Sequence, residues 1–179
     1  MHGSEDFVRT DRSVIIRKEQ GADPDAIGRV TEAAFRDMPH SRHTEQFIVD
    51  ALRRCNQLTV SLVAVDRDAV VGHVAISPVT VSPGAVGWYG LGPISVLPNY
   101  QRRGIGAKLV TAALAELVCL GGIGCVVLGD PAYYARFGFK HYPGLELSGV
   151  VPAMFQATSF GTDVPMGSVR YHNAFDATA

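Results

Sequence analysis

Apolar and polar positions follow two periods along this chain, which predicts a mixture of strands and helices. Continuous or alternating apolar runs predict strands over 13–19, 58–65, 70–82, 88–97 and 125–128, with further candidates near 153–160 and 167–171. Apolar residues three and four apart predict helices over 24–36, 44–54 and 104–120, and a short helix over 130–137. The order of these elements indicates one mixed α/β domain over 13–179, preceded by a polar tail at 1–12.

Local signals mark several boundaries. Asp23 and Pro24 supply an N-cap and a first-turn proline for the first helix. Gly121 and Gly122 end the longest helix. Pro93 lies inside a strand and cannot donate to a sheet ladder, so we expect a bulge or a local break there.

Composition narrows the classes of partner. The chain has 179 residues, 47% hydrophobic residues and a formal net charge of −1, which suits one folded domain and makes nucleic acid or an anionic membrane a poor choice of partner. Three scattered cysteines do not suggest a disulfide framework. Neither a secretory signal nor a long apolar run is visible, so we expect a cytoplasmic protein. The oligomeric state stays open, with a homodimer among the options.

The richest motif is Gln101-Arg102-Arg103-Gly104-Ile105-Gly106, between an apolar strand and the longest helix. A glycine turn that opens a helix points backbone N–H groups at one spot, and the helix dipole favours an anion there. The nucleotide-binding P-loop needs a pattern that this chain lacks, and the dinucleotide fingerprint fails because Leu109 stands where its third glycine belongs. The motif therefore predicts a cradle for a pyrophosphate.

This Q-x-x-G-x-G spacing resembles the acyl-CoA-binding motif of the GNAT N-acetyltransferases, and its flanks resemble the YhbS-like branch. The resemblance covers about 14–139, with a weaker match over 167–175. It implies a GNAT-like α/β fold, a twisted mixed sheet of about six or seven strands with helices on both faces. It also implies acetyl-CoA as co-substrate and direct transfer of its acetyl group to a primary amine of a small molecule or protein.

The resemblance assigns parts to the cofactor site. The pyrophosphate would lie on the backbone amides of Arg102, Arg103, Gly104, Ile105, Gly106 and Ala107. The pantetheine arm would pair with backbone groups near Ile94, Ser95 and Val96, in the way that a peptide adds to a sheet edge. The side chains of Ile94 and Val96 themselves are expected in the core.

A second motif runs from Gly129 to Phe139 and places a tyrosine four residues before a Gly-Phe pair. By resemblance, that tyrosine is Tyr134, which protonates the departing thiolate. A phenol of pKa about 10 and a thiol of pKa about 8.5 are well matched for this transfer. Its neighbour Tyr133 is expected to pack, and Asp130 to cap the short helix.

An amine acceptor must also lose a proton, which costs about 4 to 5 kcal/mol at pH 7 for a lysine-like amine. Glu45, His73 and Glu32 are the candidate bases, and a water chain is the alternative. Each has an ordinary structural role as well: Glu45 as a first-turn charge of a helix, and His73 as a satisfied core residue. The predicted binding strand contains no glutamate.

Two further questions stay open at this stage. His40 and His43 lie three apart but have no third ligand nearby, so we expect no metal site. The main alternative function is a non-catalytic acyl-CoA sensor on the same fold, and a second is an enzyme that uses a longer or acidic acyl-CoA.

Overall fold

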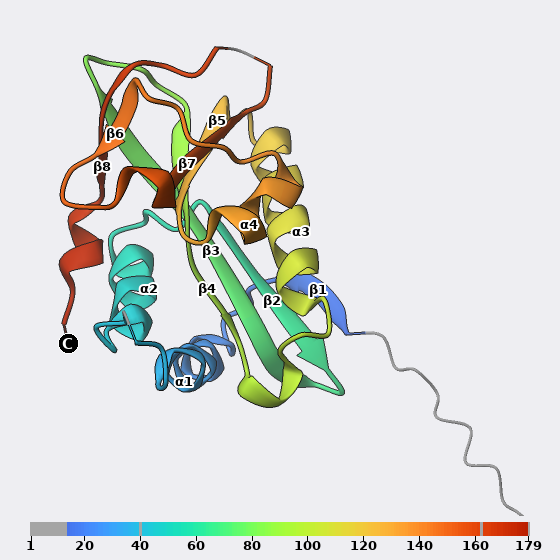
Figure 1. Cartoon of the computed structure of the whole chain (residues 1–179). Helices are drawn as coiled ribbons and strands as arrows, with labels where there is room; N and C mark the ends of the chain where they lie inside the picture. Colours follow the sequence, from blue (N-terminus) through green and yellow to red (C-terminus); the bar gives the residue numbers. More distant parts are fainter. Residues whose placement is uncertain (1–13, 40, 162, 179) are drawn as a thin grey trace, which may run out of the picture.

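A computed structural model describes residues 14–39, 41–161 and 163–178. Its eight strands form one connected sheet, and helices cover both faces (Figure 1). The strands are β1 (Ile15–Lys18), β2 (Val60–Asp66), β3 (Ala69–Ser82), β4 (Trp88–Val96), β5 (Gly124–Leu128), β6 (Leu145–Leu147), β7 (Phe155–Ser159) and β8 (Gly167–Tyr171). The α-helices are α1 (Pro24–Phe35), α2 (Glu45–Arg54), α3 (Ile105–Cys119) and α4 (Pro131–Tyr134). The expected mixed sheet with helices on both faces is confirmed, and β6 is the strand that the sequence pattern did not reveal.

The long strand β3 joins the two halves of the sheet. It pairs with β2 and β4, and its last residues pair with β8. Strand β4 pairs in parallel with β5, but only from Trp88 to Leu91, opposite Gly124 to Val127. The register of the β3–β4 pair shifts between Val74 and Ile76, close to Pro93, so the expected bulge is present. The result is a fork where β4 and β5 separate.

The α3 side of the sheet holds the largest apolar core. Helix α3 contributes the buried side chains Ile105, Leu109, Val110, Ala113 and Leu117, which pack against β2, β3, β4 and β5. These residues recur at three- and four-residue spacing, which produces the broad stripe that a helix needs to cover a sheet. Because this packing holds the start of α3 against β4, it fixes the glycine turn beside that strand.

Helices α1 and α2 cover the opposite face (Figure 1), where Ile27, Val49 and Val63 form a small apolar cluster. Asp23 occupies the N-cap position of α1, but its side chain does not form the expected capping hydrogen bond. Its carboxylate instead accepts hydrogen bonds from the Arg17 guanidinium, at 2.6 and 3.0 Å, and from the Gln20 N–H. A charged partner within reach makes a stronger bond than a neutral helix N–H, which explains the difference.

Short 3-10 helices connect several of these elements. The 3-10 helix η1 (Pro98–Tyr100) links β4 to the glycine turn, and η4 (Asn173–Asp176) packs on α2 through Ala174. The other short turns are η2 (Ala135–Phe137) and η3 (Pro152–Met154). Among the described residues, no helix combines the length and the apolarity that a membrane span requires.

Candidate functional site

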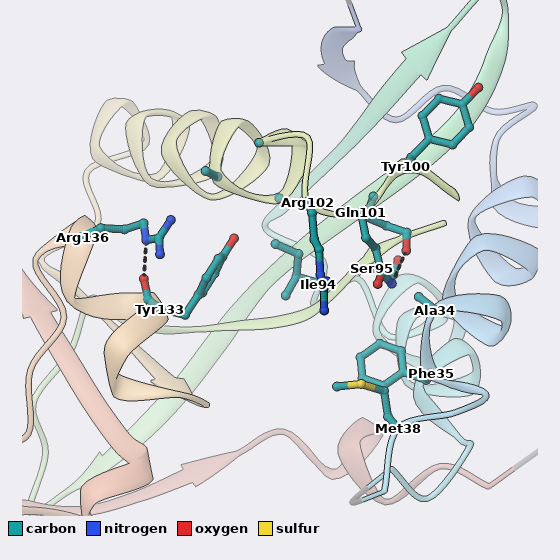
Figure 2. Close-up of a pocket in the computed structure, with 14 residues that line it drawn as sticks. Ala34, Phe35, Met38, Ile94, Ser95, Tyr100, Gln101, Arg102, Tyr133 and Arg136 are labelled. Atoms are coloured by element: carbon teal, nitrogen blue, oxygen red, sulfur yellow. Dashed lines mark hydrogen bonds between the residues drawn. The ribbon is translucent and has the colours of Figure 1, made fainter. Parts of the chain in front are cut away.

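A groove of about 580 Å³ runs between β4, the glycine turn, α4 and the end of α1 (Figure 2). This volume lies within the range of small-molecule sites. Its lining consists of Ala34, Phe35, Met38, Ile94, Ser95, Val96, Tyr100, Gln101, Arg102, Gly104, Gly106, Ala107, Tyr133 and Arg136. Two of these residues are arginines and none is acidic, so the groove favours an anionic ligand.

One wall of the groove is an open strand edge. Beyond Leu91, β4 pairs with β3 but no longer with β5. The Leu97 N–H donates to the Val71 carbonyl of the β3 side, at 2.9 Å. Because backbone polar groups alternate in direction along a strand, those of Ile94 and Val96 point away from β3. The Val96 carbonyl accepts from Gln101 Nε2 at 3.0 Å (Figure 2), and the remaining groups of this edge are available to a ligand.

Ser95 contributes to the groove in a different way. Its backbone polar groups point toward β3. Its side chain is buried under α1, with its hydroxyl 3.1 Å from the hydroxyl of Thr31. The expectation for this strand thus divides between neighbouring residues. Ile94 and Val96 present backbone groups at the open edge, whereas Ser95 anchors the strand beneath α1.

The glycine turn presents a row of free donors. Among the described residues, no hydrogen bond within the protein uses the backbone N–H of any residue from 102 to 107, and the Lys108 N–H is the first of this helix to donate, to the Gly104 carbonyl at 3.0 Å. Arg102 and Gly104 have φ angles of 60° and 77°, a left-handed conformation that curls successive N–H groups into a concave nest. Glycine takes this conformation without strain.

The other predicted cofactor residues divide by side chain. The Arg102 side chain lines the groove (Figure 2), whereas the Arg103 guanidinium lies over the ring of Tyr100, 5.2 Å from its centroid. The Ile105 side chain is buried in the α3 core. It therefore anchors the turn, and only its backbone is available to a ligand.

The two adjacent tyrosines have different surroundings. Tyr134 is buried, with its ring against Phe139 and beside Gly129, just after the end of β5. Burial raises the pKa of its hydroxyl, which keeps it protonated. Tyr133 packs against Phe137, as expected, and it also lines the groove, with its hydroxyl near Gly106 and the Arg136 guanidinium over its ring. Asp130 caps α4 through the Ala132 N–H at 2.9 Å, as expected.

His73 belongs to a buried polar cluster on the α1 side of the sheet. Its Nε2 lies 2.9 Å from the Ser61 hydroxyl, which itself donates to Glu19, and Arg53 donates to the same carboxylate. Because the Ser61 hydroxyl donates its hydrogen to Glu19, it must accept a hydrogen bond from Nε2–H of His73. The other ring nitrogen, Nδ1, is then unprotonated. Burial lowers the pKa of His73 to about 4, so the ring is neutral at pH 7.

Neither His73 nor the two glutamates line the groove. Both oxygens of the Glu45 carboxylate accept from the Ser41 hydroxyl, at 2.8 and 2.9 Å. Glu32 lines a separate pocket of about 310 Å³ with Arg36, His43 and Gln46. His40 lies outside the described residues, and the described part of the chain holds no cluster of three or more His, Cys, Asp or Glu side chains placed to bind a metal ion.

Comparisons with known proteins decide the family. A model of the Acetyltransferase (GNAT) family matches residues 27–139. The chain belongs to this family. The uncharacterized N-acetyltransferase YhbS of Escherichia coli K12 is 32% identical to this GNAT chain over 176 residues, 91% of this chain and 99% of that protein. The resemblance to the YhbS-like branch is thereby confirmed.

Solved structures agree with this assignment. A GNAT family acetyltransferase of Brucella melitensis, in complex with acetyl-CoA, is 50% identical, with a TM-score of 0.83 over 92% of this chain and 99% of that one. YhbS of Escherichia coli, in complex with CoA, is 32% identical, with a TM-score of 0.79 over 93% of each chain. The fold of this GNAT chain is therefore the fold of enzymes that were crystallised with the cofactor or its product.

Part of the groove was not predicted from the sequence. Phe35, Met38 and Arg136 line it; Phe35 and Arg136 lie within segments singled out from the sequence, but no role in binding was expected of any of the three. Phe35 ends α1 and Met38 is exposed three residues later, and in Figure 2 their side chains lie together across the groove from Tyr133. In the sequence, the apolar residue Met38 just after the end of the predicted helix was a signal that could have pointed to this end of the groove.

Proposed function

We propose that this protein transfers an acetyl group from acetyl-CoA directly to a primary amine of a small molecule or protein. The observation that carries the proposal is the free row of backbone N–H groups at 102–107, which continues into the open edge of β4 at Ile94 and Val96. A ligand with a diphosphate at one end and a chain of amides behind it matches both parts. Its relatives from Brucella melitensis and Escherichia coli hold acetyl-CoA and CoA, which are such ligands.

In this proposal the pyrophosphate lies in the nest at 102–107, with Arg102 and Arg136 adding positive charge. The pantetheine amides pair with the backbone of Ile94 and Val96, as an added strand does. Phe35, Met38 and Tyr133 then enclose the arm with apolar surface. The thioester reaches the fork between β4 and β5, close to Tyr134.

The chemistry follows from that placement. The amine nitrogen attacks the thioester carbonyl carbon, the carbonyl π electrons move to oxygen, and collapse of the tetrahedral intermediate breaks the C–S bond. The departing thiolate takes the hydroxyl proton of Tyr134, which burial keeps protonated until that step. We assign the acid role to Tyr134 rather than Tyr133 because Tyr134 lies at the end of β5, whereas Tyr133 lies near Gly106 at the phosphate end.

The proton of the attacking amine needs a separate route. Our proposal gives none of His73, Glu45 and Glu32 direct contact with the acceptor, because each is held elsewhere: Glu32 lines a separate pocket, and the other two already have hydrogen-bond partners. Glu45 is already bonded to Ser41, and His73 is enclosed by the sheet and α1. We therefore propose that water in the groove takes this proton to solvent.

An acceptor screen with thiol detection tests the proposal. We expect the wild type to release CoA thiol with at least one amine from a panel of amino acids, polyamines, aminoglycosides and peptides. Tyr134→Phe should lower turnover by about 100-fold and leave the affinity for CoA, measured by calorimetry, within twofold. Tyr133→Phe is the matched control and should alter chiefly the KM for acetyl-CoA.

Three outcomes would contradict the proposal in different ways. Binding of acetyl-CoA without turnover of any amine would favour a sensor. Turnover with a longer or acidic acyl-CoA alone would reassign the donor. Equal losses of turnover and CoA affinity in Tyr134→Phe would place that residue in packing or binding rather than in proton transfer.

A further inference from the structure

Tyr171, the last residue of β8, reaches across the sheet to β4. Val79 of β3 is its backbone partner, and its ring lies directly on Gly90 of β4. A Cβ added at Gly90 would stand 2.3 Å from the Tyr171 ring, so a side chain at position 90 would displace it. The backbone of β4 is thus built to admit this ring.

The hydroxyl that arrives there has no partner. The hydroxyls of Tyr171 and Ser77 are both buried, and among the described residues neither has a hydrogen-bond partner. Ser77 is paired with Gly90 across β3 and β4, so its side chain lies beside the Tyr171 ring. Burying a hydroxyl without a partner costs about 1–3 kcal/mol, and such groups need an explanation.

Their place in the fold supplies one. Gly90 precedes Leu91, the last residue of β4 that pairs with β5, so Tyr171 lies at the fork. Gly90 lies two residues after Trp88 and therefore on the same face of β4. Trp88 packs there in an apolar cluster with Leu145 of β6 and Val169 of β8, whereas Leu91 and Tyr134 belong to the α3 core on the other face. The fork is therefore flanked by one phenol on each face. Burial raises the pKa of Tyr171, and the electrostatic influence of Cys125 and Tyr134 adds to it, which agrees with their proximity.

We propose that the Tyr171 hydroxyl donates a hydrogen bond to the carbonyl oxygen of the acetyl group when the thioester occupies the fork, with Ser77 beside it. This inference rests on the proposed function. The sulfur then faces Tyr134 and the carbonyl oxygen faces Tyr171. As the amine attacks, negative charge develops on that oxygen, and a donor already aimed at it strengthens its bond without reorganisation. Tyr171 keeps its proton throughout.

A binding experiment tests this without knowledge of the acceptor. Calorimetry compares acetyl-CoA with CoA on the wild type, Tyr171→Phe and Tyr142→Phe. We expect Tyr171→Phe to weaken acetyl-CoA about fivefold and to leave CoA unchanged. Tyr142 is a matched control, because it is another half-buried tyrosine packed against the same cluster, and its variant should match the wild type with both ligands. Ser77→Ala should weaken acetyl-CoA by no more than twofold.

Stability and kinetics supply independent readouts. Tyr171→Phe removes no protein hydrogen bond, so its Tm should equal or exceed that of the wild type. With an active acceptor, its kcat should fall 10- to 100-fold while the acceptor KM stays constant.

Equal affinities of wild type and Tyr171→Phe for acetyl-CoA would overturn the inference. A lower Tm with parallel losses of both ligands would also overturn it, in favour of a packing role, and a change confined to the acceptor KM would reassign Tyr171 to the acceptor. Failure of the wild type to bind either ligand would instead overturn the proposed function.

Discussion

The two faces of the sheet formed by β2, β3 and β4 differ in the polarity of their buried side chains. On the α3 face, Leu62, Val74 and Ile76 are buried in the largest apolar core. On the α1 face, the same three strands carry the polar residues Ser61, His73 and Ser95, and Thr31 of α1 bonds to the last of these. Glu19 and Arg53 complete this polar layer.

The two faces therefore hold their surroundings in place by different interactions. The α3 face positions the groove through apolar packing, and the groove itself offers backbone groups of β4 and of the glycine turn. The α1 face depends on specific side-chain hydrogen bonds, each of which leaves an unpaired group if one member is removed. We therefore expect substitutions in the glycine turn to act on cofactor binding, and substitutions in the polar layer beneath α1 to act on stability and its pH dependence.

The largest effect should come from the glycine turn. Gly104→Glu places a carboxylate at the nest and forces a side chain into a φ of 77°, so we expect CoA affinity to fall at least 100-fold. Gly121→Glu is the matched control, because Gly121 has a φ of 82°, also has open space around it, and lies just beyond the other end of α3.

Calorimetry with CoA and thermal melts of both variants separate strain from ligand repulsion. The two Tm values should fall together, while only Gly104→Glu loses CoA. Retention of wild-type affinity in Gly104→Glu would mean that the nest does not bind the cofactor, and that the α3 face does not position a cofactor site.

The second effect concerns pH. The pKa of His73 is about 4 in the folded protein and about 6.5 when unfolded, so the unfolded chain takes up the proton first. This contribution to stability is fully present above pH 6.5 and is lost as the pH falls toward 4, by about 3 kcal/mol in all. Urea titrations at pH 7.5, 5.5 and 4.5 measure it.

His73→Gln isolates this contribution. Glutamine can still donate to Ser61 but does not titrate, so the difference between wild type and variant should shrink as the pH falls. The pKa values of the Glu19 and Asp23 carboxylates are lowered in the folded protein, so their protonation in acid also destabilises it, but it does so in both proteins. Parallel pH profiles for the two proteins would show that His73 is not the titrating group.

The glycine turn and helix α3 could be predicted from the sequence because their signals are local. Gly104 and the following apolar stripe lie within a few residues of each other, and a glycine turn that opens a helix has a direct physical meaning. The same locality explains why Asp130 was assigned correctly as a cap. Periodicity likewise predicted seven of the strands, because each of them alternates or is fully apolar.

Other features depend on contacts that no local pattern encodes. Tyr171 contacts Gly90 although 80 residues separate them in the chain. Asp23 bonds to Arg17 on a neighbouring strand and not to the helix N–H groups that it was expected to cap. Strand β6 has only three residues, too few for a period to appear. The surroundings of Tyr133 and Tyr134 differ because α4 turns one toward the groove and the other into the core, which spacing alone does not determine.

A third, smaller effect should separate adjacent arginines. Arg102 lines the groove and Arg103 lies over Tyr100, so Arg102→Ala should weaken CoA about fivefold and Arg103→Ala by less than twofold. The loss in Arg102→Ala should diminish at high salt, because a partly exposed charge pair is screened. Equal effects of the two substitutions would mean that the cradle works through net charge and not through position.

The smallest effect should come from Glu45, and it bears directly on the α1 side. If Glu45 were the base, Glu45→Gln would lower kcat by about 100-fold and remove the acid limb of the pH–rate profile. Its carboxylate is instead held by Ser41 at the start of α2, outside the groove, so we expect kcat and the pH–rate profile to stay within twofold of wild type. Ser41→Ala is the control, because it releases the carboxylate without removing it. A large loss in Glu45→Gln, with Ser41→Ala active, would give the α1 side a direct catalytic group and would end the division between a binding face and a stabilising face.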